Sequence, residues 1–251
     1  MKGFGKYIWM SVGVALMACT TVSCSDFLEE NPKGQLPSKG YFKDKSALDA
    51  SLNALYSIVA TSQASNNFCG TNFLAGDDIS THPSSNKQPL REHDQFSVAD
   101  NNSWLSSMWE QRFKVIKAAN FIINNAGETP GASEEEIHST LGQAYYWRAF
   151  SYFYLVTTWG PVPVTLKEEI DYNAPLSSVE DIYTLIVEDL KKAEEWCPAL
   201  YEKEPYGRDG FNLAVSEGAV KATMAYVYMC MAGWPMNKGA EYYRLAAQKA
   251  E

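Results

Sequence analysis

Apolar residues recur at helical spacing in several separate segments of this chain. The stripes occupy residues 48–59, 105–123, 137–155, 182–190 and 220–231. Because positions three and four residues apart share one side of a helix, each stripe predicts an amphipathic helix with one buried face. The pattern therefore predicts an all-α fold.

Polar residues before each stripe and glycine or proline after it define the expected helix ends. Ser133 and Glu136 form a capping box, in which each side chain bonds the other residue's backbone N–H. Ser178 and Ser216 are capping residues of the same kind. The expected spans are Asp44 or Ser46 to before Asn66, Asn102 or Ser103 to Gly127, Ser133 to Gly160, Ser178 to Pro198, and Ser216 to Gly233.

The later helices are organised in pairs. A last helix begins near Lys238 and still continues at Glu251, and together with residues 216–233 it has about the length of a 34-residue tetratricopeptide unit. Residues 141–198 form a second such pair with an insertion at 160–177. Since the last helix has no stop signal, we expect the chain to be truncated before a C-terminal half. The prediction is tetratricopeptide-like helical pairs.

One long segment interrupts this helical pattern. Residues 68–102 are rich in Gly, Asp, Asn, Ser and Pro and show little periodicity. A compact domain seldom keeps an irregular loop of this length without a use for it, and binding residues are often found on loops that a rigid scaffold holds. We therefore expect a functional loop here.

The N-terminus has the features of a bacterial lipoprotein signal. Lys2 and Lys6 precede an apolar run over residues 7–18, which is too short to span a bilayer. Small residues then lead to Cys24, the expected lipidation site, with Cys19 as an alternative site and an ordinary signal with a free Cys24 thiol as another interpretation. The expected organisation is a signal peptide over 1–23, a tether over 24–43 and a helical domain over 44–251.

Composition and motifs exclude several functions. The chain carries a formal net charge of −9 and has no run of Lys or Arg, which argues against nucleic acid as a partner. HExxH, GxSxG, P-loop and GxGxxG motifs are missing from the sequence, and neither its cysteines nor His82 and His93 have a metal-ligand spacing. We expect no enzymatic activity, no metal and no cofactor.

Several segments, in this order, resemble the SusD/RagB family of outer-membrane lipoproteins from Bacteroidetes. They are residues 24–29 (CSDFLE), 52–56 (LNALY), 74–78 (LAGDD), 104–116, 119–120 (AN), 148–155 (RAFSYFYL) and 159–163 (WGPVP). The resemblance implies a helical tetratricopeptide-like scaffold, lipid-anchored on the outer membrane and facing the exterior. It also implies a TonB-dependent SusC-like transporter as partner and capture of an oligosaccharide, or for some members a peptide, before import.

The loop and the start of the following helix supply the candidate ligand-binding residues. Asp78, Arg91 and Asn101 are candidates for hydrogen bonds to sugar hydroxyls, and Trp104 for stacking on a sugar ring if it is exposed. The alternative function is a helical scaffold, or a truncated remnant, that contacts the transporter and has no ligand site of its own.

Other conspicuous side chains are expected to be structural. Trp109 and Trp147 lie on apolar stripes, which favours packing in the core over ligand binding. Arg148 lies among aromatic residues, and we expect it to make a structural contact between helices.

Overall fold

The computed structural model describes residues 40–64, 76, 78, 80–83, 85–168, 171, 173–202 and 205–251. Apart from Gly40, all of them belong to one compact unit, Tyr41–Glu251. The predicted signal peptide over 1–23, the lipidation candidates Cys24 and Cys19, and residues 24–39 of the predicted tether lie outside the described residues.

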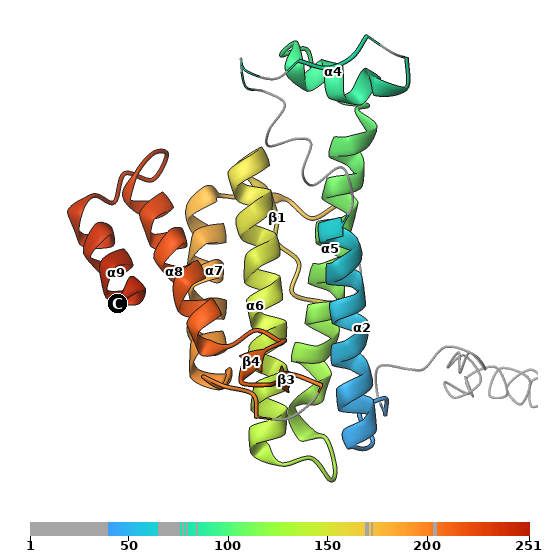
Figure 1. Ribbon diagram of the computed structural model, residues 1–251, viewed down its shortest axis with the longest axis vertical. Helices are drawn as coiled ribbons and strands as arrows, with labels where there is room; N and C mark the ends of the chain where they lie inside the picture. Colours follow the sequence, from blue (N-terminus) through green and yellow to red (C-terminus); the bar gives the residue numbers. More distant parts are fainter. Residues whose placement is uncertain are drawn as a thin grey trace, which may run out of the picture. The chain divides into compact units, whose positions relative to one another are not determined.

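The described unit is helical, as the periodicity predicts. Its main helices pack in chain order, so that each contacts the next, and successive helices run in alternate directions (Figure 1). Their bounds are α2 Lys45–Ala64, α5 Ser103–Asn125, α6 Glu134–Trp159, α7 Val179–Trp196, α8 Glu217–Ala232 and α9 Ala240–Ala250. A 3-10 turn, η4 Ala126–Glu128, follows α5. No helix in the described part of the chain is both long and apolar enough to cross a membrane.

The predicted caps are confirmed. The Asn102 side chain accepts hydrogen bonds from the backbone N–H groups of the first turn of α5. Ser133 and Glu136 form both hydrogen bonds of the capping box at α6. The Ser178 and Ser216 side chains each accept one backbone hydrogen bond, from Asp181 N–H in α7 and Ala219 N–H in α8. Because these short side chains satisfy N–H groups that a helix leaves free, they fix where each helix begins.

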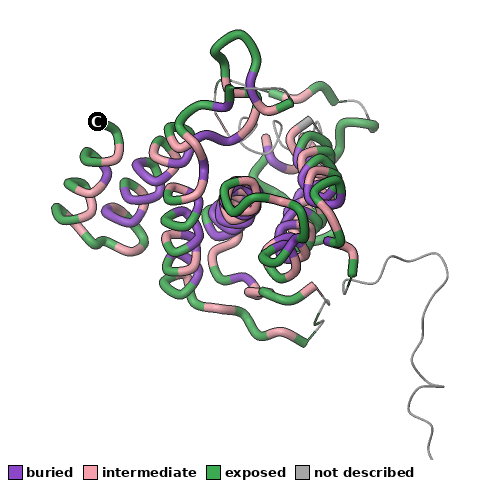
Figure 2. Tube along the Cα trace, turned by 90° about the horizontal axis from the view of Figure 1, so that it is seen from below, coloured by how far each residue is buried: buried purple, intermediate pink, exposed green. Residues whose placement is uncertain are grey.

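Two hydrophobic clusters form the core, and α6 contributes to both. One joins α6, α7 and α8 through residues such as Leu155, Ile186 and Met224. The other joins α2, α5 and α6, and it includes Phe42, which packs against the ring of Phe121. Figure 2 shows the buried positions on the sides of the helices that face one another. The end of the predicted tether thus packs in the core.

Two short antiparallel ribbons lie in the connections between helices. β1 Val162–Pro163 pairs with β2 Leu176–Ser177, and β3 Gly207–Arg208 pairs with β4 Phe211–Asn212. Gly207 is required by close packing, since a Cβ built there would lie 1.6 Å from the carbonyl oxygen of Tyr201. Strands of two residues are too short to leave an alternating pattern, and the sequence did not predict them.

The loop expected over residues 68–102 contains helical structure in its described part. A 3-10 turn, η3 Ser85–Lys87, leads into helix α4 Gln88–Asp94, with Pro89 in the first turn. Proline is favourable there because that turn has no internal partner for the N–H that proline lacks. A helix of seven residues has too few turns to show a periodicity. The prediction of an irregular loop over the whole of 68–102 is therefore wrong for residues 85–94, which are helical.

Candidate functional site

A hydrogen-bonded corner joins α4 to the start of α5. The Asn102 amide donates from Nδ2 to Glu92 Oε2 over 2.7 Å and to the Pro89 carbonyl oxygen over 3.1 Å, while its Oδ1 caps α5. The hydrogen bond from Asn102 holds the pKa of Glu92 below its ordinary value because it stabilises the carboxylate. One buried asparagine therefore fixes the orientation of α4 on α5.

The predicted ligand residues are distributed around this corner. Arg91 lies on α4 and donates from Nη1 to the His82 carbonyl oxygen at 3.3 Å. Asn101 is exposed directly before the cap, and Trp104 is half-buried in the first turn of α5. The corner thus brings Arg91, Asn101 and Trp104 to one end of α5. Asp78 is exposed, and its neighbours in sequence lie outside the described residues.

Two cavities open along α5 beyond this corner, and Trp109 lines both. The smaller, of about 350 Å³, is termed the Trp159 pocket and begins beside the corner at Asp100. The larger, of about 490 Å³, is termed the Trp109 groove. It is lined by Trp109, Glu110, Phe113, Lys114, Lys117, Pro163, Thr165, Lys167, Glu168, Asp171 and Ala174. None of the four predicted ligand residues lines either cavity.

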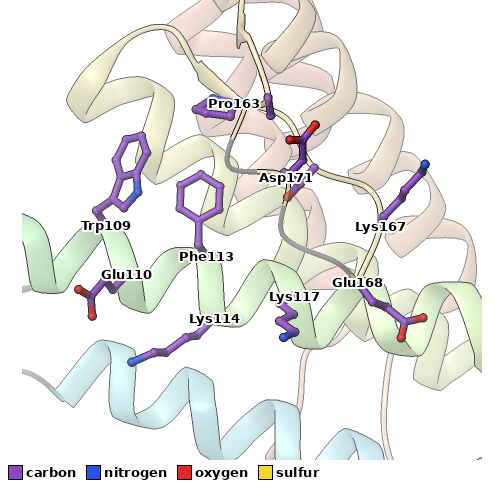
Figure 3. A pocket seen from close by; sticks show the side chains of 11 residues that line it. Trp109, Glu110, Phe113, Lys114, Lys117, Pro163, Lys167, Glu168 and Asp171 are labelled. Carbon is purple, nitrogen blue, oxygen red and sulfur yellow. The ribbon is translucent and has the colours of Figure 1, made fainter. Parts of the chain in front are cut away.

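Aromatic rings form the floor of these cavities. The ring centroids of Trp109 and Phe113 are 4.9 Å apart, and those of Trp109 and Trp159 are 5.3 Å apart with the rings nearly perpendicular. All three are half-buried and pack against the core. In Figure 3 the Trp109 and Phe113 rings rise from α5 toward Pro163, whereas Glu110 and Lys114 point away. The predicted packing of Trp109 is confirmed, and the same ring also lines a groove.

Three asparagines on α5 hold the opposite wall of the Trp109 groove. Asn120 Nδ2 donates to the carbonyl oxygens of Thr165 and Lys167 at 2.9 and 3.1 Å. Asn124 Nδ2 donates to the Leu166 carbonyl oxygen at 3.0 Å, and Asn125 Nδ2 to Glu168 Oε1 at 2.5 Å. The segment over 165–168 therefore has a fixed path although it belongs to no sheet.

A buried ion pair orients the central asparagine. Arg148 donates from Nε and Nη2 to the two carboxylate oxygens of Asp189, each over 2.7 Å, and from Nη1 to Asn120 Oδ1 over 2.9 Å. Burial alone would lower the pKa of Arg148, but the hydrogen bonds to Asp189 outweigh it and raise this pKa. The structural contact predicted for Arg148 is confirmed, and it links α5, α6 and α7.

The sequence carries one signal for this wall of the groove. Asn120, Asn124 and Asn125 are polar residues on an otherwise apolar stretch of helix, and Asn120 is fully buried. Buried polar groups have partners, so this pattern predicts a bonded segment. It does not identify that segment, which lies about 40 residues further along the chain. In the described part of the chain, no three His, Cys, Asp or Glu residues form a group suited to a metal ion.

Comparisons with known proteins place these features in a family context. The profile of the SusD-like family described as starch-binding and associating with the outer membrane matches residues 26–229. SusD-like protein P2 from Formosa agariphila is 34% identical over 195 residues, which are 73% of this chain and 37% of that protein.

Solved structures have the same fold. A SusD superfamily protein from Parabacteroides distasonis superposes with a TM-score of 0.70 at 23% identity, over 86% of this chain and 44% of that one. A crystal structure with a xylogluco-oligosaccharide gives a TM-score of 0.62 at 26% identity, over 81% of this chain and 39% of that one. The chain thus spans less than half the length of each of these relatives.

Proposed function

Because this chain belongs to the SusD-like family of starch-binding proteins that associate with the outer membrane, we propose that it binds nutrient oligosaccharides and does not cleave them. The family match over residues 26–229 carries the proposal, and a relative of the same fold solved with a xylogluco-oligosaccharide supports the ligand class. Delivery of the bound sugar to a TonB-dependent SusC-like transporter is the second part of the proposal.

The site proposed for this activity is the corner between α4 and α5. Sugar recognition needs side chains that bond hydroxyls beside an aromatic face that covers the apolar side of the ring. Arg91 and Asn101 supply donors and an acceptor, and Trp104 supplies the aromatic face at the same end of α5. Asp78 is assigned to the same site as a hydrogen-bond acceptor.

Attachment to the membrane is proposed to occur through a lipid on Cys24. Two or more acyl chains hold a protein on a bilayer stably, whereas one chain is marginal. Replacement of Cys24 by Ala is expected to release the protein from the membrane fraction, and Cys19→Ala is expected to leave it there. Release by Cys19→Ala alone would assign the lipid to Cys19.

Titration calorimetry of the purified chain with malto-oligosaccharides and xylogluco-oligosaccharides tests the activity. We expect saturable binding and no shorter sugars on chromatography after prolonged incubation. Trp104→Ala is expected to weaken binding by about tenfold. The matched control is Trp234→Ala, because Trp234 is an exposed tryptophan in the turn between α8 and α9. Absence of binding to every sugar tested, or release of sugar products, would contradict the proposal.

A second candidate function is a scaffold that binds only the transporter. The observation in its favour is the exposure of Tyr226, Met229, Trp234 and Tyr243 on α8, α9 and the turn between them. Exposed apolar residues that gather on one side of a protein often mark a protein interface. This function predicts that Trp234→Ala weakens co-purification with the transporter and that wild-type protein gives no heat with any sugar.

A further inference from the structure

We propose that the Trp109 groove is a second oligosaccharide subsite, which binds one or two neutral sugar rings beyond the corner between α4 and α5. The inference rests on the proposed function, since it assigns a further site to the same class of ligand. The groove is separate from the corner, because none of Asp78, Arg91, Asn101 and Trp104 lines it.

The floor of the groove has the chemistry that a pyranose requires. Trp109 and Phe113 pack against the core on one side and line the groove on the other. They project in the same direction, toward Pro163 (Figure 3). Together they offer an apolar surface wider than one ring, which suits the C–H face of a sugar. The volume of about 490 Å³ lies in the range of small-molecule sites.

Hydrogen-bonding groups of both charges surround this floor. Three lysines and three acidic residues contribute equally, so the lining has no net charge. They are Lys114, Lys117 and Lys167, and Glu110, Glu168 and Asp171. None of these lysines forms an ion pair with another described residue. Glu110 and Lys114 point away from the aromatic rings (Figure 3), and without them the lining still has two lysines and two acidic residues. A lining of balanced charge favours a neutral sugar over an acidic one.

The part of the groove wall over residues 165–168 is held in place by hydrogen bonds within the protein. Asn120 and Asn124 hold three consecutive carbonyl groups of the wall, and Arg148 holds Asn120. Tyr152 adds a further bond, because its hydroxyl accepts from the Thr165 N–H over 2.8 Å. A wall that is already ordered saves the ligand the entropic cost of ordering it, which favours binding.

The test fills the groove without removing any of its packing. Ala174→Trp places a large ring in the lining, and Ala247→Trp is the matched control because Ala247 is exposed on α9. Phe113→Ala is a second variant, which removes part of the floor. Calorimetry with a xylogluco-oligosaccharide and with a malto-oligosaccharide is expected to show a Kd at least about tenfold higher for Ala174→Trp and Phe113→Ala, and an unchanged Kd for Ala247→Trp. Thermal unfolding of each variant checks that it is folded before its Kd is compared.

The outcomes separate this inference from the proposed function. Wild-type binding that Ala174→Trp leaves unchanged, while Trp104→Ala weakens it, overturns the second subsite and leaves the function intact. Binding of neither sugar by the wild-type protein overturns the proposed function and this inference with it. A lower Kd for a galacturonate oligosaccharide than for the neutral sugars overturns the assignment of a neutral ligand.

Discussion

The buried ion pair of Arg148 and Asp189 supports one wall of the Trp109 groove. Both side chains are at least nine-tenths buried, and each carboxylate oxygen of Asp189 accepts one guanidinium N–H. The third guanidinium nitrogen, Nη1, donates to Asn120 Oδ1 and fixes the orientation of this amide, so that its Nδ2 faces the groove wall. An amide turned the other way would present its oxygen to two carbonyl oxygens. The ion pair therefore determines which end of Asn120 meets the wall.

Removal of one member of this pair is expected to cost more than removal of both. Arg148→Met leaves the Asp189 carboxylate buried and unpaired, and we expect the free energy of unfolding to fall by about 3–5 kcal/mol. The double variant Arg148→Met, Asp189→Leu is expected to recover most of this loss. Urea denaturation measures both. The control is Lys238→Met, which breaks the exposed pair with Glu180 and should cost far less than Arg148→Met, because solvent screens exposed charges. A single-variant loss as small as the control's would refute the argument.

At the scale of elements, α4 contains a buried polar atom whose hydrogen-bonding capacity is not used. His93 is 8% exposed, and its Nε2 has no hydrogen-bond partner among the described residues. Burial lowers the pKa of His93, because the protonated ring would lose its hydration, and nearby Glu92 opposes this shift only in part. The buried ring contributes packing, but its polar nitrogen reduces the stability of α4.

The stability of α4 is expected to depend on pH through His93. Since the folded-state pKa is lowered, the opened form binds the proton more tightly, and α4 is most stable above the ordinary value of 6.5 and loses stability as the pH falls below it. His93→Leu should remove this dependence and stabilise α4 by about 1 kcal/mol. Hydrogen exchange of residues 88–97 at pH 5.5 and 7.5, corrected for intrinsic rates, measures both effects. His82→Leu, at an exposed position, should retain the dependence.

The main helices could be predicted from the sequence, whereas the groove could not. The caps that Ser133 and Asn102 form lie within the first turns of their own helices, and a local signal is sufficient to place a helix end. Asn120 is different, because its partners lie far away in sequence and depend on how α5, α6 and α7 pack. Trp109 likewise could be predicted only in part. Its place on the apolar stripe indicated packing in the core, but the cavity beside its half-buried ring depends on how the other elements pack around it.

The candidate site was predicted only in part. The chemistry of Arg91, Asn101 and Trp104 was visible in the sequence, but the placement of Arg91 at the same end of α5 as the other two depends on α4. That helix is shorter than the window in which periodicity can be recognised, and the hydrogen bond from Asn102 to Glu92 holds it in place. The position of the corner thus depends on a hydrogen bond between two helices, which the periodicity of the sequence cannot predict.

At the scale of the whole molecule, the two helices at the ends of the row are unequally anchored. α2 packs on α5 and α6 and buries Leu48, Leu52 and Leu55. α9 packs on α8, and Ala246 is its one buried residue. Because local stability follows buried apolar contact, α9 should open far more often than α2.

Hydrogen exchange of the whole chain measures this difference in local stability between α2 and α9. We expect amides of α9 to exchange at least about tenfold faster than those of α2, and those of α6, which contributes to both core clusters, to be the slowest. Both α2 and α9 lie at an edge of the helical row, so edge position alone cannot produce the difference (Figure 1). Equal protection of α2 and α9 would contradict the expectation.

The asparagine bonds along α5 have a consequence for how recognition could change over evolution. Asn120 and Asn124 bind main-chain oxygens at residues 165, 166 and 167, and every amino acid supplies the same oxygen. The path of the backbone therefore does not depend on which side chains occupy these three positions. New residues could be exchanged there, by natural drift or in a designed library, and each variant would present different chemistry on an unchanged frame.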